Sequence, residues 1–587
     1  MNDQEKKIVA YSNFADQKRK EGDTKTAGEY FSAALVLLTK FGAAPAIEAA
    51  LLSNFGIYLQ SQGESDEAIK LQQRALKLDE LEGDPANLGY SHHNLGTALA
   101  NAKRYDEAIK HLEEARRIRE SINDIHELIY TYEALCNAYF DSGQYDKVRL
   151  CEKQARKIAP LLKNQYSFRG IAMTMASLES KQGNLDKASH YATEAISYIE
   201  ERRTGHSDLE LDLYDSRYNK HYLTAIELFL EVKDYRSALT LVDRTRFRSA
   251  CDMLDQLRSY GGRDDLGELV LPAIDDNELV LVEWLYPKYD WSFPLRANQT
   301  RIDAHKITTS THEGGQVRYN LETEWFKHAQ NSLRQTQCVI DYYADELDKT
   351  KRITFVPHGT QWQTPMAALI NPITNKPLCD THQLLLSPSL RYCNITDKRP
   401  RIQQKNCLVV GDPNDNLSHA RHEAKEVASK LNCTPLLGAD AKKDTVLKNL
   451  AENEYDVVHL ACHGSYASDG LHGIVLADGY ITDKEIISNG ITANTVNLTA
   501  CWGGFADFSI WNELDGFVRA LLISGVRNVV ASAYPLGDQA GMAFSEKFYS
   551  SYIDGVHPVE ATRLGISNVA SQFPARSWCG LYITGQR

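Results

Sequence analysis

The sequence has no run of about 18 apolar residues, which is the shortest stretch that reads as a membrane-spanning helix. Its longest apolar stretch, 520–533, is interrupted by Gly525, Arg527 and Asn528. The first seven residues, Met-Asn-Asp-Gln-Glu-Lys-Lys, lack the apolar core of a secretory signal. We therefore expect neither a membrane span nor a signal peptide.

Close cysteine pairs are also missing: the 11 cysteines are scattered, and no two are separated by only two residues. A secreted disulfide scaffold is smaller and denser in cysteine, and a zinc site needs closely spaced ligands. There is also no Gly-x-x-x-x-Gly-Lys-Ser/Thr loop, and this absence argues against the hypothesis that the protein is a nucleotide-driven enzyme. The sequence therefore predicts reduced, mostly buried thiols, no metal site, no cofactor and a cytoplasmic location.

The chain has little concentrated positive charge. Its net charge is −13 and no dense Lys/Arg block occurs, which argues against nucleic acid or an anionic membrane as the main partner. An apolar content of 43% with 24% charged residues is ordinary for globular proteins. At 587 residues the chain is too long for one hydrophobic core, so two to four domains are expected.

The N-terminal half contains an internal repeat of about 40 residues. Small residues recur in four columns that stay in register over five units. The columns are Gly22, Gly63, Lys103, Gly143, Gly183; Ala27, Ala68, Ala108, Val148, Ala188; Ala34, Ala75, Ala115, Ala155, Ala195; and Ala15, Gly56, Gly96, Cys136, Ala176. A looser sixth copy begins at Lys233-Asp-Tyr-Arg-Ser-Ala238 and leads into an expected helix over 240–257. This spacing indicates pairs of helices joined by a tight turn, with small residues where the helices approach closely.

The pattern resembles tetratricopeptide repeats with a lengthened unit, and we assign residues 1–258 to such an all-α superhelical array. Arrays of this kind present a concave surface, so we expect it to bind a regulatory protein or peptide. A spacer or an oligomerisation arm is the alternative. The aromatic residues Tyr90, His93, Tyr130 and Tyr132 are expected in helix packing rather than in ligand contact.

The C-terminal half has the pattern of an α/β domain. The stretch 259–276, which contains Tyr260-Gly-Gly-Arg-Asp-Asp, indicates a linker, and residues 277–587 form the second domain. Strands are expected at 279–285, 352–356, 408–413, 456–462, 496–500 and 526–532, with helices near 422–431 and 445–451. Strands that alternate with helices predict a largely parallel sheet covered on both faces, with a ligand site beyond the carboxyl ends of the strands.

Two reactive side chains follow consecutive strands of this sheet, His463 and Cys501, 38 residues apart. A Cys thiolate can attack a peptide carbonyl, while imidazole takes the thiol proton and returns it to the leaving amine. The backbone N–H groups of Gly464 and Cys501 could hold the oxyanion that develops on that carbonyl. The sequence therefore predicts a His463–Cys501 catalytic dyad.

The two segments His459-Leu-Ala-Cys-His-Gly464 and Leu498-Thr-Ala-Cys-Trp-Gly-Gly504 resemble the signatures of the CHAT domain, within the caspase, separase and gingipain-like peptidases. Cys462 and Tyr534 depart from the residues common there. The resemblance covers about 276–585, with support from the stretches 355–359, 364–369, 387–390, 424–428, 515–525 and 529–533. It implies a caspase-like cysteine endopeptidase that cleaves a protein substrate. Together with the repeats it implies a prokaryotic regulatory setting such as antiviral defence, in which a companion protein is the substrate.

Other residues near the dyad have more ordinary interpretations. His459 shares a strand face with His463 but lies about 13 Å away at 3.3 Å per residue, so it is expected to be structural. Cys462 points to the opposite face and should be inert packing, which also rules against a metal site built from these three residues. Asp412 could line the pocket for the residue before the scissile bond; the alternative is a turn-forming Asp before Pro413. Asp538 is expected to cap a helix.

The leading hypothesis is an endopeptidase that is regulated by partner binding to the repeats. The alternative is a non-catalytic scaffold in which the protease domain is vestigial. Because the segment between His463 and Cys501 is short, we expect activation by conformational change in the single chain rather than by cleavage between them.

Overall fold

The structure is a computed structural model of the whole chain. It describes residues 1–20, 23–162, 166–203, 221–245, 271–286, 289–307, 326–397, 401–402, 405–466, 472–499, 507–508 and 514–586. The chain divides into two compact units, Met1–Lys233 and Asp234–Arg587, which are described separately. Within the described ranges, no helix has both the length and the apolar content that crossing a membrane requires.

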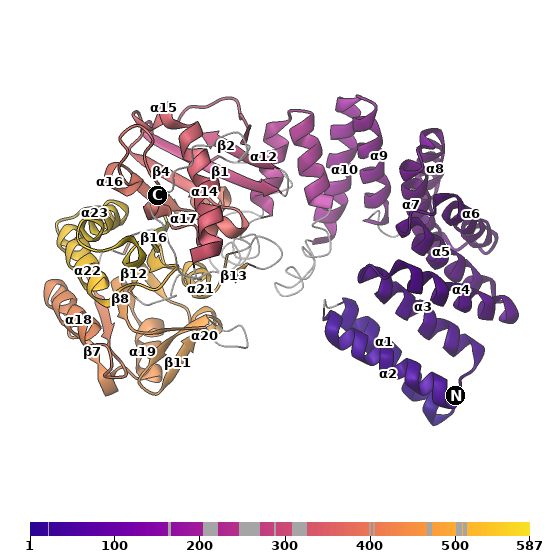
Figure 1. Ribbon diagram of the computed structural model, residues 1–587, viewed down its shortest axis with the longest axis horizontal. Helices are drawn as coiled ribbons and strands as arrows, with labels where there is room; N and C mark the ends of the chain where they lie inside the picture. The colour runs from indigo at the N-terminus through magenta and orange to yellow at the C-terminus, as the bar shows by residue number, and fades with distance from the viewer. Residues whose placement is uncertain are drawn as a thin grey trace. The chain divides into compact units, whose positions relative to one another are not determined.

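The first unit is a succession of antiparallel helix pairs, which confirms the predicted repeat array (Figure 1). Each helix packs most closely on its neighbours along the chain, as in a solenoid. The helices are α1 (Asp3–Lys20), α2 (Thr24–Phe41), α3 (Pro45–Ser61), α4 (Ser65–Glu82), α5 (Pro85–Asn101), α6 (Tyr105–Ser121), α7 (Ile125–Asp141), α8 (Tyr145–Ile158), α9 (Arg169–Lys181) and α10 (Leu185–Arg203).

The small-residue columns have the two roles that the spacing predicts. Gly63, Gly143 and Gly183 turn the chain between paired helices with φ of 82°, 77° and 78°, and Lys103 takes the same left-handed conformation with φ of 61°. The described alanines of the other columns are fully buried. At Gly96, a Cβ atom would lie 2.7 Å from Cγ of Leu112, so only glycine lets α5 approach α6 this closely.

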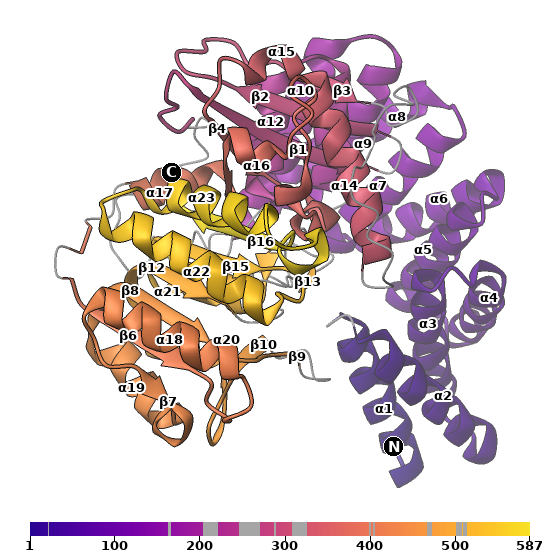
Figure 2. The same ribbon diagram turned by 60° about the vertical axis from the view of Figure 1, so that its left-hand side comes forward.

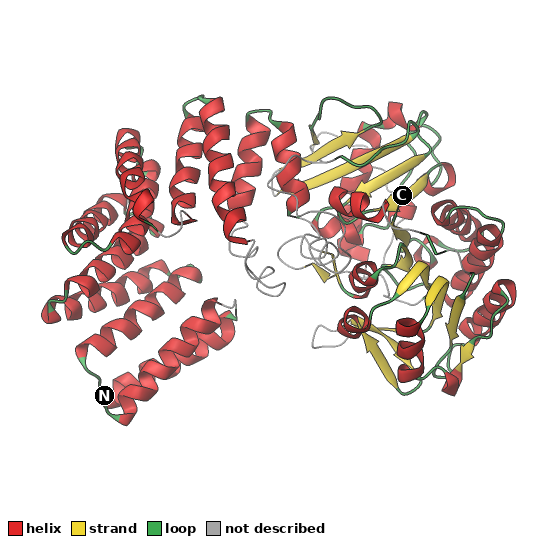
Figure 3. Ribbon diagram, turned by 180° about the vertical axis from the view of Figure 1, so that it is seen from behind, coloured by secondary structure: helices red, strands yellow, loops and turns green. Residues whose placement is uncertain are grey.

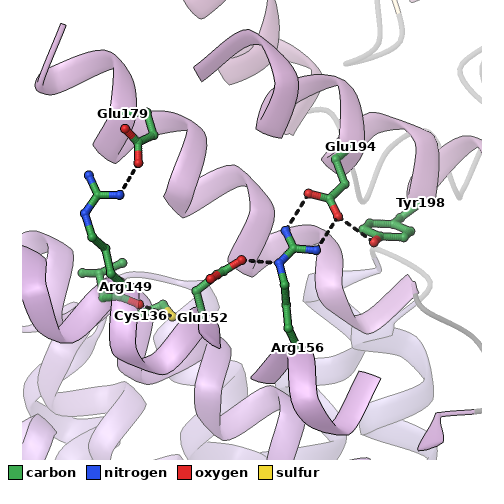
Figure 4. Close-up of polar contacts among 8 residues, drawn as sticks. Cys136, Arg149, Glu152, Arg156, Glu179, Glu194 and Tyr198 are labelled. Atoms are coloured by element: carbon green, nitrogen blue, oxygen red, sulfur yellow. Dashed lines mark hydrogen bonds and ion pairs between the residues drawn. The ribbon is translucent and has the colours of Figure 1, made fainter. Parts of the chain in front are cut away.

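Arginines on α8 tie neighbouring repeats together (Figure 4). Arg149 pairs with Glu179 on α9. Arg156 pairs with Glu152 on its own helix and donates two hydrogen bonds of 3.0 and 2.9 Å to Glu194 on α10. Its guanidinium also lies 4.9 Å from the ring centre of Phe168. These bonds add directional contacts to the packing between neighbouring repeats.

Replacing Arg156 with Ala is expected to lower the stability of this part of the array by about 1–2 kcal/mol, because one ion-pair network and two cation–π contacts, with Phe168 and Tyr191, are lost. Burial pushes the pKa of Glu194 upward, but bonds from Arg156 and Tyr198 outweigh it and hold the pKa below 4.5. The network's contribution is therefore complete above pH 4.5 and is lost as the pH falls through the lower folded-state pKa. Urea unfolding at pH 7 and pH 4 measures both effects.

The matched control is Arg117→Ala, which removes an exposed pair with Glu114 within a single helix. It should leave unfolding almost unchanged, because exposed pairs contribute little. An Arg156→Ala protein that unfolds like the Arg117→Ala protein at both pH values would contradict this role.

The second unit is built on an 11-stranded sheet, with strand order β3-β2-β1-β4-β5-β16-β15-β12-β8-β6-β7 (Figure 3). Its strands are β1 (Glu278–Tyr286), β2 (Tyr289–Leu295), β3 (His305–Ile307), β4 (Arg352–Val356), β5 (Gln383–Leu386), β6 (Cys407–Gly411), β7 (Leu436–Leu437), β8 (Glu454–Ala461), β12 (Thr492–Leu498), β15 (Asn528–Ser532) and β16 (Leu581–Gly585). Smaller sheets consist of β9 (Gly464–Tyr466), β10 (His472–Leu476) and β11 (Gly479–Thr482), and of β13 (Asp507–Phe508) and β14 (Leu514–Asp515). The predicted largely parallel sheet is confirmed.

The sheet has an internal change of direction that the sequence did not indicate. All its pairings are parallel except β1–β2, β2–β3 and β15–β16. Because β16 is antiparallel to β15 and parallel to β5, the block β1-β4-β5-β16 runs opposite to the block β15-β12-β8-β6-β7. The carboxyl ends of β8 and β12 therefore lie at the edge opposite to those of β4 and β5.

Helices cover both faces of this sheet. Three of them, α18 (Ser418–Leu431), α22 (Asp538–Ile553) and α23 (Pro558–Ala570), lie side by side on one face (Figure 2). The remaining named helices are α12 (Tyr235–Arg244), α14 (Phe326–Tyr342), α15 (Ala344–Leu347), α16 (Leu378–Thr381), α17 (Leu390–Asp397), α19 (Lys443–Glu452), α20 (Asp483–Asn489) and α21 (Phe517–Ser524). Short 3₁₀ turns of the second unit are η3 (Gly359–Gln363), η4 (Met366–Ala368), η5 (Gly438–Asp440) and η6 (Ala575–Ser577). The first unit contains two others, η1 (Ala159–Leu161) and η2 (Tyr166–Phe168).

The helix α12 belongs to the second compact unit, although the repeat pattern assigns it to the sixth copy of the array. The buried carboxylate of Asp243 accepts hydrogen bonds of 2.6 and 3.1 Å from the backbone N–H groups of Leu390 and Arg391, at the start of α17. Unpaired N–H groups at a helix start favour a negative charge, which explains this contact. The domain limit at 258 and the linker 259–276 stay predictions, because residues 246–270 lie outside the described part of the chain.

Candidate functional site

The strands that precede His463 and Cys501 are direct neighbours in the sheet. The strands β8 and β12 are parallel, and Leu460 pairs with Leu498, a difference of 38 positions. His463 and Cys501 differ by the same 38 positions. The register therefore brings the chain to His463 and toward Cys501 at the same level of the same sheet edge. Cys501 itself lies outside the described residues, which resume after Thr499 only at Asp507.

His463 is half-buried and lies in the two-residue interval between β8 and β9. Its carbonyl accepts a hydrogen bond of 2.8 Å from the N–H of Val475 in β10, which fixes the main chain at this point. Nε2 of its imidazole lies 3.2 Å from Oδ1 of Asn416. Gly464, the predicted oxyanion donor, is the first residue of β9 and pairs with Ile474. Its role in holding an oxyanion, like the role of Cys501, stays a prediction.

Asp412 holds the loop that carries Asn416. Its backbone N–H donates to the carbonyl of Ala461, at the end of β8, over 2.9 Å. Its buried carboxylate accepts from the N–H groups of Asn416 and Leu417, both at 2.8 Å, and from Nε of Arg421 at 2.8 Å. Burial works to raise the pKa of Asp412, but the bond from Arg421 and the two backbone bonds outweigh it and keep the pKa below its usual value. These contacts favour the turn-forming interpretation, and the pocket role stays an untested prediction.

Two backbone features let this loop form. Asp412 has φ of 42°, in the left-handed region that Asp tolerates better than most residues. Gly411, the residue before it, lies against α18: a Cβ atom there would be 2.3 Å from Cβ of Ala424. The absence of a side chain at Gly411 lets α18 pack on the end of β6, so that Arg421 can reach Asp412.

His459 is the structural histidine that the sequence predicts. It is fully buried; its Nδ1 lies 3.1 Å from the Tyr549 hydroxyl, and its Nε2 lies 3.3 Å from Oε1 of Glu423. Glu423 is also buried and accepts a hydrogen bond of 2.7 Å from the Ser545 hydroxyl. These side chains form a polar cluster between β8, α18 and α22. No sequence pattern indicates this cluster, because its members are scattered over three separate segments of the chain.

Two further predictions at this edge can be compared with the structure. Cys462 is buried, and burial raises the pKa of its thiol to about 12, as expected for inert packing. Asp538 is the first residue of α22, whose N-cap is Gly537, so the expectation of a side-chain cap was wrong. Its carboxylate instead lies 3.1 Å from Nδ1 of His419.

The first unit contains a candidate partner site, a groove of about 680 Å³ lined mainly by α5, α7, α9 and the helical segment that includes His221, with Leu112 of α6. Its polar lining includes His93, Asn101, Tyr130, Glu133, Asn137 and Arg169. Burial lowers the pKa of His93 to about 3, and burial raises the pKa of Glu133 against the opposing effect of Arg169. Of the aromatic residues expected in helix packing, Tyr132 is buried, whereas His93 and Tyr130 line the groove.

Among the residues that the structure describes, no group of three His, Cys, Asp or Glu side chains is arranged to hold a metal ion.

Comparison with protein families identifies the two parts of the chain. Residues 333–583 match the CHAT domain, and residues 7–80 and 88–160 match the tetratricopeptide repeat. The chain thus combines N-terminal tetratricopeptide repeats with a C-terminal CHAT domain.

Individual relatives are distant. The chain is 24% identical over 297 residues to tetratricopeptide repeat protein 28 of Homo sapiens, and 23% identical over 299 residues to the Mus musculus protein. Each alignment covers 40% of this chain but only 12% of the relative.

Among solved structures, the separase–securin complex of Saccharomyces cerevisiae aligns over 95% of this chain and 54% of that one, with 10% identity and a TM-score of 0.43. A STAND signal transduction ATPase with a tetratricopeptide repeat sensor from Pyrococcus horikoshii aligns over 41% of this chain and 36% of that one, with 18% identity and a TM-score of 0.31.

Proposed function

We propose that the protein is a cysteine endopeptidase that cleaves a specific protein substrate with His463 as general base and Cys501 as nucleophile. The observation that carries this proposal is the parallel register of β8 and β12, whose offset of 38 positions equals the separation of the two residues. Neighbouring strands lie about 4.8 Å apart, a spacing that side chains of this size can bridge.

In the first step, Sγ of Cys501 would attack the substrate carbonyl and pass its proton to His463. The backbone N–H groups of Gly464 and Cys501 would stabilise the oxyanion. His463 would then protonate the leaving amine, and water would release the acyl group from the sulfur.

The groove in the repeat array is the proposed site for a regulatory protein or peptide. The groove of about 680 Å³ is lined by helices of three successive repeats, and concave surfaces that extend over several repeats are the ones that such arrays use to bind partners. Control would operate on the intact chain, since part of the segment between His463 and Cys501 is folded as β9, β10, β11 and α20. As the CHAT architecture implies, the setting would be a prokaryotic regulatory or antiviral defence system in which a companion protein is cleaved.

The direct test is incubation of the wild-type chain with proteins encoded next to it, followed by mass spectrometry of the products. Wild type should produce defined fragments and Cys501→Ala should produce none while still binding the same proteins. If binding persists but no activating condition yields fragments with wild type, the alternative of a non-catalytic scaffold with a vestigial protease domain holds instead.

A groove variant extends the same experiment to the regulatory site. Asn137→Arg places a long cation in the groove and should abolish partner binding and the cleavage that depends on it. Asn87→Arg is the matched control, because Asn87 is exposed on α5 outside the groove lining. If both variants bind the partner equally well, the partner does not bind in this groove.

A further inference from the structure

Within the described part of the chain, the side chain of Asn416 makes a polar contact with the imidazole of His463. Oδ1 of Asn416 lies 3.2 Å from Nε2 of His463, although the two residues are 47 positions apart in the chain. No residue type or spacing in the sequence marks Asn416, because it lies in the loop after β6, a strand on the side of β8 away from β12.

We infer that Asn416 is a positioning residue that holds the His463 imidazole in the orientation and tautomer required of a general base. This inference rests on the proposed function, and it adds a third residue to the proposed dyad.

The chemistry of the contact decides the tautomer. An amide oxygen can only accept a hydrogen bond, so Nε2 of His463 must carry the proton that it donates to Asn416. The other ring nitrogen, Nδ1, then keeps its lone pair and can take the proton of a thiol. The same bond restricts rotation of the ring, which an unbonded half-buried histidine would retain.

Asn416 is itself held in place before any substrate arrives. Its backbone N–H donates to the carboxylate of Asp412, which is also bonded to Leu417 and Arg421. Arg421 further pairs with Asp415 in the same loop. Since Asp412 also bonds to the carbonyl of Ala461, the loop and the end of β8 form one connected unit. A preformed support of this kind avoids the cost of ordering a side chain during the reaction.

The test measures the reactivity of Cys501 and needs no substrate. Iodoacetamide is added at a series of pH values, and modification of the Cys501 peptide is followed by mass spectrometry. In this reaction Sγ forms a bond to the reagent carbon, iodide leaves with the electron pair of the broken bond, and His463 accepts the thiol proton. The variants are Asn416→Leu, Asn416→Asp and His463→Ala, with Asn489→Leu as control because that exposed amide bonds only within α20.

We expect Asn416→Leu to slow Cys501 modification at neutral pH by about 10-fold, the effect of one hydrogen bond to a group that becomes charged. Asn416→Asp keeps an acceptor and should restore the rate, with the pH midpoint moved upward because a carboxylate favours the imidazolium. The charged side chains bonded within this loop, Asp412, Asp415 and Arg421, are the same in every variant, so the midpoint shift reports the change at position 416. The Asn489→Leu protein should match wild type.

Two results separate failure of this inference from failure of the proposed function. If His463→Ala slows modification but Asn416→Leu matches wild type in rate and midpoint, Asn416 has no positioning role and the dyad stands. If His463→Ala also matches wild type, the dyad fails and the inference fails with it. Should Asn416→Leu not fold, nitrogen NMR of His463 in the wild type decides: a proton on Nε2 at neutral pH supports the inference, and a proton on Nδ1 overturns it.

Discussion

Replacing His463 with Ala is expected to reduce the rate of substrate cleavage by about 10²- to 10⁴-fold, the usual contribution of a positioned general acid and base. Without the imidazole, the thiol of Cys501 would have to lose its proton to water, and the leaving amine would depart without a proton donor. Folding should be unaffected, because His463 is half-buried and its described side-chain contact is a single hydrogen bond to Asn416.

The measurement is kcat/KM on a protein substrate found by the incubation experiment, with thermal unfolding measured in parallel. His419→Ala is the matched control: His419 is a half-exposed histidine at the start of α18, and it contacts Asp538 rather than the proposed dyad. The control should keep wild-type activity. A His463→Ala protein that retains wild-type kcat/KM would remove His463 from the mechanism, whatever the outcome for Cys501.

Replacing Glu423 with Ala is expected to destabilise the CHAT domain by about 3–5 kcal/mol, because removing one member of a buried pair leaves the other without its partner. Glu423 exposes 3% of its side chain and His459 exposes none. The Ser545 hydroxyl loses its acceptor in the same substitution. Urea unfolding measures the loss of stability. Hydrogen exchange in peptides from β8 shows whether that loss occurs around His459.

Glu426→Ala, on the exposed side of the same helix, is the control and should change stability by no more than about 0.5 kcal/mol. A second variant tests the reason for the effect. Changing His459 to Leu together with Glu423→Ala removes both polar partners, so the double variant should be more stable than Glu423→Ala alone. Equal losses in the single and double variants would show that the cost comes from the cavity rather than from the unpaired histidine.

Much of the fold could be predicted from the sequence where local pattern is strong. Strands such as β4 and β8 are runs of apolar and β-branched residues, and the structure places them within two residues of the predicted limits. The predicted first residues of helices and strands were less accurate. The helix α18 begins at Ser418 rather than near His422, because its polar first turn lacks the apolar spacing that marks a helix. The strand β12 begins at Thr492 because Asn494, Thr495 and Asn497 are buried despite their polarity. The four-residue strand β5 is too short to produce a recognisable period.

The sequence suggested the reactive residues of the candidate site, but it contained no sign of the residues that support His463. His463 and Cys501 could be proposed because each follows a strand-like run. Asn416, Asp412 and Arg421 meet through a loop whose shape depends on the packing of α18 against Gly411. Contacts of that kind depend on distances between segments, and a sequence pattern records no such distances.

By itself, the sequence determined the repeat array and the α/β character of the second half, and it led to the proposed pair His463 and Cys501, because each rests on periodicity or on residues next to a strand. Only the tertiary structure decided that β8 and β12 are neighbours in matching register, that Asn416 contacts His463 and that a groove runs along α5, α7 and α9. Strand order and loop packing depend on how distant segments bury one another's apolar surface, and that competition is settled only when the whole domain folds.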